Sequence, residues 1–250
     1  MNTPGLTLTT VDGMRLALLN DDAHVRYQFG EKLAPEVTEL AAALAPCFEW
    51  MDPLTTAADR AGTQQAGLAA GFGLGVLDDL LVATRLLLGG QLAAAGNVMR
   101  QVIEGIAMSV LCSAHDDLII SRKKTGPVMG CYWALAHRSD PSVQAHHALE
   151  QLGWNAAQLG LTHAAVERLR LAKRHYNQFS HCGWATIASR VIRDTPGLVY
   201  LGGHFDEGKL DLYRDELHER IGLSGVLPQF LEHLLGAMQP AADAPAQGLT

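Results

Sequence analysis

The amino-acid sequence predicts an all-α protein, a multi-helix bundle built on an antiparallel helical hairpin with at most minor β structure. Alanine and leucine are abundant while aromatic residues make up only 6% of the 250 residues, a composition that favours helices over sheets. Apolar residues recur at spacings of three and four in several segments. The proportions of hydrophobic and charged residues, 48% and 18%, are those of an ordinary globular protein. We therefore expect one helical domain over residues 1–238 and a disordered, alanine- and proline-rich tail over 239–250.

The N-terminal segment predicts one small strand followed by a helix. Residues 6–11 alternate apolar and polar side chains, the period of a strand, and Asp12-Gly13 supplies a turn. Pro35 suits the first turn of a helix, and apolar residues then recur with helical spacing. We expect Pro53 to end that helix.

The central region predicts the helical hairpin. One or two helices extend from about Thr56 to Leu88, Gly89-Gly90 breaks the pattern, and a further helix covers 91–113. The apolar residues of this last helix fall on one face: Leu92, Gly96, Met99, Ile103, Ile106 and Val110. Glycines at 67, 71 and 75 recur every four residues with no strand before them, so they favour close helix–helix packing over a nucleotide-binding loop.

The second half of the chain predicts shorter elements and two more long helices. Residues 116–161 contain several turn signals and are interpreted as short helices joined by loops. Thr162 is placed to cap a helix that continues through Tyr176 towards Arg190. Residues 198–200 form a candidate extended segment, and a final helical region at 210–238 is expected to be interrupted near Pro228.

Charge, cysteine usage and hydropathy exclude several classes of protein. A formal net charge of −7 argues against bulk attraction to nucleic acid, so any contact with RNA must be local. The four cysteines are far apart and form no C-x-x-C pair, which fits unpaired thiols better than disulfides or zinc. No secretory signal and no uninterrupted apolar run long enough for a bilayer are found, so we expect a cytoplasmic protein without membrane, metal or cofactor.

One segment, residues 173–181, concentrates reactive side chains. If the helix is continuous, Arg174 and His181 lie two turns apart on one face, with Asn177 between them. Their separation along the axis is roughly 10 Å, which leaves room for a phosphodiester. Histidine transfers protons near neutral pH and arginine holds phosphate oxygens, a combination suited to metal-independent RNA cleavage.

The same segment is the most basic part of the chain. Residues 164–193 contain one glutamate, Glu167, and six positively charged side chains: Arg168, Arg170, Lys173, Arg174, Arg190 and Arg193. A local cationic surface in an acidic chain is compatible with binding RNA. We assign the catalytic candidates to Arg174, His175, Asn177 and His181, and the substrate-binding candidates to Arg100, Glu104, Arg170, Lys173, Tyr176 and Ser180.

Arg174-His175, followed by five residues and His181, resembles the arginine–polar–spacer–histidine motif of the HEPN superfamily of helical proteins. The resemblance covers about eight residues. Many members are RNA-cleaving toxins or phage-defence nucleases and others are non-catalytic. It implies a homodimeric ribonuclease in which His181 is the acid/base and Arg174 the phosphate clamp. His175 and Asn177 would then orient the substrate or the catalytic groups.

A second resemblance joins two helices. Arg100-Gln-Val-Ile-Glu104 and Tyr176-Asn-Gln-Phe-Ser-His181 are similar to a pattern in uncharacterised helical bacterial proteins, which implies no particular activity. Arg100 and Glu104 are spaced to pair across one helical turn, which predicts either an exposed ion pair or an auxiliary group beside Arg174.

The alternative to a catalytic site is a solvated helix face. Polar residues opposite an apolar stripe are usual in amphipathic helices, and the expected stripe here is Ala165, Leu169, Ala172, Tyr176, Phe179, Gly183 and Ile187. Under that interpretation the chain is a non-catalytic interaction or regulatory module with a protein partner. His115-Asp116-Asp117 is interpreted as a loop or cap, and the adjacent His146 and His147 point too far apart to chelate a metal together.

Overall fold

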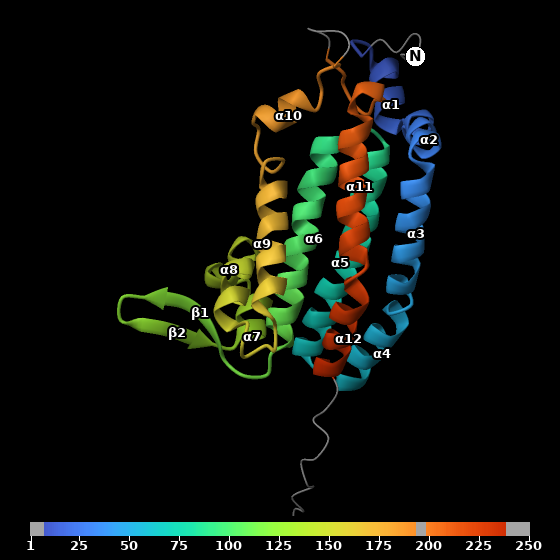
Figure 1. Cartoon of the computed structure of the whole chain (residues 1–250). Helices are drawn as coiled ribbons and strands as arrows, with labels where there is room; N and C mark the ends of the chain where they lie inside the picture. Colours follow the sequence, from blue (N-terminus) through green and yellow to red (C-terminus); the bar gives the residue numbers. More distant parts are fainter. Residues whose placement is uncertain (1–7, 194–198, 239–250) are drawn as a thin grey trace, which may run out of the picture.

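The computed structural model describes residues 8–193 and 199–238 of the chain, and it is a mostly helical bundle (Figure 1). The first helices are α1 Val11–Leu19, α2 Ala23–Lys32, α3 Ala34–Phe48, α4 Met51–Ala61, α5 Gln64–Leu88 and α6 Leu92–Ser113. Strands β1 Leu118–Lys123 and β2 Gly126–Gly130 precede α7 Tyr132–His137, the 3-10 turn η1 Pro141–Val143 and α8 Ala145–Asn155. The rest is α9 His163–Asn177, α10 Trp184–Ala188, η2 Glu207–Lys209, α11 Leu210–Ser224 and α12 Leu227–Met238. The all-α class with a minor sheet is confirmed.

Helices α5 and α6 form the antiparallel hairpin at the centre of the bundle (Figure 1). The Thr63 hydroxyl caps α5 by accepting a 3.2 Å hydrogen bond from the Ala66 amide. Gly90 turns the chain with a φ of +78°, a backbone conformation that favours glycine. Fifteen of the 22 residues of α6 are buried, including all of Ile106–Ser113, so other layers cover most of this helix. The expected hairpin and its Gly89-Gly90 break are therefore confirmed.

Two prolines, Pro53 and Pro228, lie in the first turns of helices, and the expectation that Pro53 ends a helix was wrong. Pro53 does not end the preceding helix, which stops at Phe48. Instead Pro53 lies in the first turn of α4, where the missing amide hydrogen has no intrahelical partner to lose. Pro228 likewise lies in the first turn of α12, and the break before it divides the last helical region as expected.

Residues 118–130 form an antiparallel hairpin, so the expectation of only short helices and loops over 116–161 was wrong in part. The two strands project from the bundle (Figure 1) and a register shift lies between Ile119 and Ser121. Asn155 of α8 holds the strand as a neighbouring strand would: its Oδ1 accepts from the Ile119 amide at 2.8 Å, and its Nδ2 donates to the Ile119 carbonyl at 3.0 Å. Tertiary hydrogen bonds from a helix thus replace a third strand.

Other expectations concern the ends of the chain. The strand expected at residues 6–11 is not formed at its described end, where the Thr10 hydroxyl caps α1 and Val11 begins the helix. The extended segment expected at 198–200 lies partly outside the described residues, and Val199 makes an isolated antiparallel bridge to Val191. Residues 239–250, expected to be a disordered tail, also lie outside the described part of the chain.

The long helix α5 is unusually apolar for a helix that is only partly covered. Among the described helices it alone is long and apolar enough to cross a membrane by length and composition, and 44% of its most apolar 18-residue window is buried. The glycines at 67, 71 and 75 do not provide close helix packing among the described residues, because a Cβ added to any of them would meet nothing within 4 Å. The expectation was wrong for these three, whereas a Cβ on Gly73 of the same helix would overlap Leu234 of α12.

Candidate functional site

Helix α9 carries most of the predicted site and packs against α6. The Thr162 hydroxyl caps its start, as expected, by accepting from the Ala165 amide at 3.2 Å. Tyr176 and Phe179 are buried, and the Phe179 ring lies where a side chain on Gly96 of α6 would stand. The expected apolar stripe is correct at these two positions and also at Leu169 and Ala172, which are partly buried against the core. Ala165 is exposed, however, and the stripe does not extend to Ile187, which is 49% exposed on a different helix.

The helix ends at Asn177, so Arg174 and His181 do not share one continuous helical face. After Asn177 the backbone tightens into turns, with the Ser180 amide donating to the Asn177 carbonyl at 3.2 Å. The Ser180 hydroxyl donates to the same carbonyl at 2.8 Å. Gly183 then begins a separate helix, α10. The assumption of a helix continuing towards Arg190 was wrong because serine and glycine here favour a turn and a new cap.

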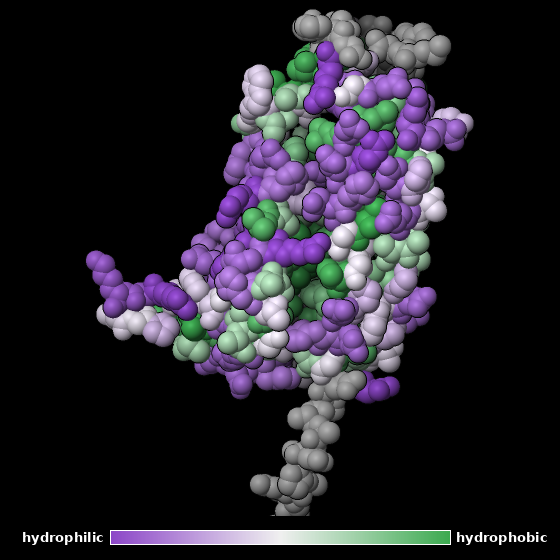
Figure 2. All heavy atoms as spheres, in the orientation of Figure 1, coloured by the Kyte–Doolittle hydropathy of each residue, from purple (hydrophilic) through white to green (hydrophobic). Residues whose placement is uncertain are grey.

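Arg174, Asn177 and His181 are nevertheless all exposed. Within residues 8–193 and 199–238, neither Arg174 nor His181 makes a side-chain hydrogen bond or ion pair. Hydrophilic side chains cover most of the molecular surface over α9 (Figure 2). The structure therefore leaves a cation and an imidazole available to solvent at the end of α9.

His175 is the predicted site residue with the most organised surroundings. Its Nε2 lies 2.7 Å from Oε1 of Glu216 on α11. The His175 side chain is 43% exposed, whereas the Glu216 side chain is 2% exposed. A buried carboxylate thus fixes one nitrogen of a half-exposed imidazole and leaves Nδ1 as the nitrogen without a hydrogen bond to the described residues.

Arg220 and Tyr176 hold Glu216 from the interior. Arg220 Nη1 donates to Glu216 Oε2 at 2.7 Å and to the Glu216 carbonyl at 2.6 Å. The Tyr176 hydroxyl donates to Oε2 at 3.4 Å. Among the described atoms, Nε and Nη2 of the fully buried Arg220 have no hydrogen-bond partner. Both oxygens of the carboxylate are therefore used, and its position relative to His175 is set by groups on α9 and α11.

These contacts move the pKa values of the pair in opposite directions. The hydrogen bond to Glu216 raises the pKa of His175, and this exceeds the lowering effect of partial burial. Burial alone would raise the pKa of Glu216, but the His175 hydrogen bond and the Arg220 charge together lower it. The pair therefore favours a positively charged imidazole beside a negatively charged carboxylate.

A second cluster joins α9 to α6. Glu104 Oε1 lies 3.1 Å from Arg100 Nε and 3.1 Å from Lys173 Nζ. Lys173 also donates to the His146 carbonyl at 2.9 Å. Glu104 is buried, so the interpretation of Arg100 and Glu104 as an exposed pair was wrong. The sequence did not reveal the third member of the cluster, Lys173. Its contact with Glu104 depends on how α9 packs on α6 and not on residue spacing within α6.

Several charges of the basic segment are occupied by neighbours. Arg170 pairs with Glu167, and its guanidinium lies over Gly153 of α8, where a Cβ would collide with it. Lys173 forms an ion pair with Glu104, and the Arg193 guanidinium donates a hydrogen bond to the Gly208 carbonyl. The cations of this segment whose side chains make neither a hydrogen bond nor an ion pair to described residues are Arg168, Arg174 and Arg190. The cationic surface is therefore smaller than the sequence suggests.

Glu216 and Arg220 were not among the predicted site residues. A signal for them existed: Tyr213, Leu217 and Ser224 recur at spacings of four and seven, and Glu216 and Arg220 fall on the same side of α11. A carboxylate and a guanidinium on a buried face are uncommon unless paired. Their partner on α9, His175, could not be identified from spacing alone.

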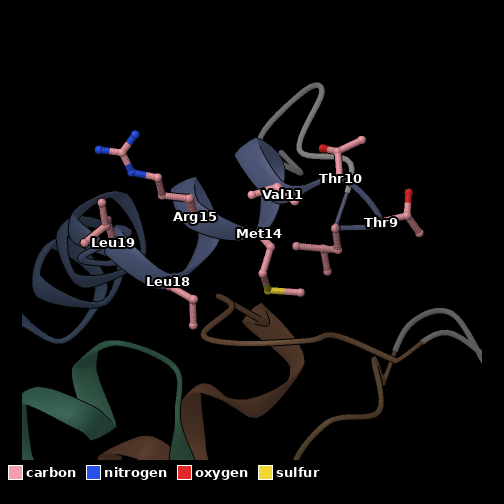
Figure 3. Close-up of a pocket in the computed structure, with 8 residues that line it drawn as sticks. Thr9, Thr10, Val11, Met14, Arg15, Leu18 and Leu19 are labelled. Atoms are coloured by element: carbon pink, nitrogen blue, oxygen red, sulfur yellow. The ribbon is translucent and has the colours of Figure 1, made fainter.

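Two hollows lie away from these clusters. One of about 590 Å³ lies beside α1, where Met14 and Leu18 point towards a neighbouring segment of the chain (Figure 3). Another of about 850 Å³ is lined by residues of α4, α5 and α12 together with His115. Neither is lined by a predicted site residue.

No metal is indicated by the donor groups that the structure describes. Within residues 8–193 and 199–238, histidine, cysteine, aspartate and glutamate side chains do not gather in a group of three that could hold an ion. The polar groups near His175 are a buried carboxylate, guanidinium and phenol, and the carboxylate orients the imidazole for proton transfer. Comparison with known protein-family models, with curated proteins and with solved structures finds no match to this chain.

Proposed function

We propose that the chain is a metal-independent endoribonuclease with His175 as its main proton-transfer group. The observation that supports this most directly is the 2.7 Å bond between half-exposed His175 and buried Glu216, next to an exposed Arg174. A histidine oriented by a buried carboxylate is an arrangement suited to general acid–base catalysis. The toxin or phage-defence setting rests on the motif resemblance alone.

In the proposed reaction, a ribose 2′-hydroxyl loses a proton and attacks its own phosphorus, and the bond to the 5′-oxygen breaks. The products are a 2′,3′-cyclic phosphate and a 5′-hydroxyl. Because the pKa of His175 is raised by its bond to Glu216, its cationic form suits protonation of the leaving 5′-oxygen from Nδ1. His181, from the same chain or a second copy, is the candidate base for the 2′-hydroxyl. Arg174 would hold a phosphate oxygen and stabilise the developing charge.

This assignment changes the roles that the sequence suggested. His181 was expected to be the principal acid/base and His175 an orienting group. Because α9 ends at Asn177, His181 does not share a helical face with Arg174, which weakens its role as principal acid/base. The contact with Glu216 favours His175 for that role. Lys173 and Glu104 would act by holding α9 against α6, because their charged groups are already engaged with each other.

The test is cleavage of end-labelled single-stranded RNA by the purified chain in the presence of EDTA. The variants are His175→Gln, Arg174→Gln and His181→Gln, with His163→Gln as a matched control at the opposite, exposed end of α9. We expect His175→Gln to reduce the rate by about 100-fold or more. The control should cleave like the original chain, and an RNA with a 2′-deoxy sugar at the cleaved position should be resistant. Absence of cleavage by the original chain, or equal rates for it and His175→Gln, would contradict the proposal.

A second candidate function, a non-catalytic interaction module, is favoured by apolar side chains on the surface. Val11 and Leu18 on α1 are 86% and 77% exposed, and Trp184 on α10 is 81% exposed. Both helices lie at the same end of the bundle (Figure 1). Exposed apolar groups of this size are typical of partner-binding surfaces.

The two functions separate in a cellular assay of growth after induced expression. If the chain acts as an interaction module, Trp184→Ser and Leu18→Ser should abolish the effect on growth while His175→Gln retains it. The ribonuclease proposal gives the reverse pattern. Circular dichroism of each purified variant checks that its helix content is unchanged.

A further inference from the structure

The outward face of α5 is an apolar helix surface that nothing in the described chain covers. Because an α-helix turns 100° per residue, Gly71, Asp78, Val82 and Arg85 fall within one narrow stripe. Val82 in the stripe is 37% exposed, and Leu81, which lies beside the stripe near Arg85, is 40% exposed. On a helix whose most apolar window is 44% buried, covering these side chains with another helix would remove apolar area from water.

The stripe contains two opposite charges in a regular arrangement. Asp78 and Arg85 are seven residues apart, about two helical turns, and both are exposed. Neither side chain makes a hydrogen bond or ion pair within residues 8–193 and 199–238. Leu81 and Val82 lie midway between them. The face therefore has an apolar centre with a negative group on one side and a positive group on the other.

This pattern is complementary to itself when the helix is turned end for end. A twofold axis between residues 81 and 82 places Asp78 of one helix opposite Arg85 of an antiparallel copy, and Arg85 opposite Asp78. The same axis brings Leu81 and Val82 of the two copies together. Gly71 and Gly75 meet no atom where a Cβ would stand, so they add no bulk between the two helices.

We propose that the outward face of α5 binds a second copy of this chain in an antiparallel, twofold arrangement. The interface has apolar contacts at its centre and two reciprocal Asp78–Arg85 pairs at its flanks. This surface lies on α5 and is independent of the proposed chemistry at His175. The proposed interface would cover the exposed Leu81 and Val82 side chains and would also pair the Asp78 and Arg85 charges.

Charge reversal tests the arrangement because both charges come from the same chain. Asp78→Arg places two arginine side chains opposite each other at both flanks, and Arg85→Asp places two aspartates together. The double variant Asp78→Arg/Arg85→Asp restores opposite charges in the exchanged positions. Glu39→Arg, a reversal at an exposed site on α3 without an ion pair to described residues, is the matched control.

The measurement is sedimentation equilibrium of the full chain over a range of concentrations at about 0.1 M salt. We expect a dimer whose dissociation constant rises at least about tenfold in each single reversal, as two attractive pairs become repulsive. The double variant should return towards the original value and Glu39→Arg should not change it. Val82→Glu, which puts a charge at the apolar centre, should give a monomer.

Three results would overturn the proposal. One is a monomeric original chain at all concentrations. Another is a dimer that both single reversals leave unchanged, which would place the interface elsewhere. The third is a monomer that floats with phosphatidylcholine vesicles and ceases to do so in Val82→Glu, which would assign the apolar face to lipid.

Discussion

The imidazole of His175 on α9 and the carboxylate of Glu216 on α11 are joined by a 2.7 Å hydrogen bond between a half-exposed and a buried side chain. Because the bond favours the charged imidazole, Glu216→Gln should lower the pKa of His175. The shift can be followed by nuclear magnetic resonance of the imidazole protons against pH. This result does not depend on whether the chain cleaves RNA.

Glu219→Gln is the matched control for this measurement. Glu219 is exposed and raises the pKa of His175 only through its charge, after the contributions of Glu216. Its replacement should therefore lower the pKa less than Glu216→Gln does. If His175 titrates at the same pH in Glu216→Gln and in the original chain, the hydrogen bond is not the group that sets its protonation.

The buried carboxylate of Glu104 gives a prediction about stability. Glu104→Gln removes the charge that holds Lys173 and Arg100, whose side chains are 15% and 23% exposed. We expect a loss of about 1–3 kcal/mol in the free energy of unfolding, since the two cations remain partly buried without their partner. Urea unfolding followed by circular dichroism measures it.

The comparison for Glu104 is Glu167→Gln on α9. Glu167 pairs with Arg170 at the surface, with both side chains at least 35% exposed. Pairs of this kind contribute about 0–1 kcal/mol, so this variant should unfold close to the original chain. Equal losses in the two variants would contradict the idea that burial makes the Glu104 cluster important.

The sequence predicted the parts of the fold that depend on local periodicity. The hairpin of α5 and α6, the Gly89-Gly90 break and the Thr162 cap follow from spacing and capping chemistry, and each is found. The strand pair at 118–130 was missed because Asn155, far along the chain, supplies the hydrogen bonds that hold its inner strand. Contacts of that range leave no periodic signal.

The candidate site was predicted in composition but not in arrangement. Periodicity treated residues 163–190 as one helix, whereas local hydrogen bonds around Ser180 end it after Asn177. The sequence identified His175 as a candidate and left out Glu216, because two residues 41 positions apart become neighbours only when α9 and α11 come together in the folded chain. Which histidine is supported by a carboxylate is therefore a tertiary property.

Close packing of α9 on α6 predicts the effect of adding one methyl group. In Gly96→Ala the new Cβ would overlap the ring of Phe179, so the two helices must separate or the ring must move. We expect a loss of about 1–3 kcal/mol in the free energy of unfolding. Gly30→Ala in α2 is the control, because its Cβ would meet nothing and alanine favours helix by about 0.5–1 kcal/mol. The two alanine variants should differ in sign, and a stabilised Gly96→Ala would contradict the packing.

His204 provides a pH dependence opposite in sign to that of His175. Burial, and then the nearby charge of Lys209, lowers the pKa of His204 to about 4. Its Nε2 lies 3.4 Å from Lys209 Nζ, so protonation would bring two cations together in a buried place. In the unfolded chain a histidine takes up its proton near pH 6.5. Below that pH the histidine is protonated in the unfolded state but stays neutral in the folded state. The free energy of unfolding therefore falls until the pH reaches about 4.

His204→Gln removes this proton uptake, so its free energy of unfolding should fall less than that of the original chain between pH 7 and pH 4.

His175→Gln should behave in the opposite way. The raised pKa of His175 stabilises the folded state most below the unfolded value, and that contribution is lost as the pH rises through the folded pKa. Urea unfolding at half-unit steps from pH 4 to pH 9 measures both differences. His233→Gln, at an exposed position on α12, is the matched histidine replacement. If the two differences change with pH in the same direction, one of the two environments is assigned wrongly.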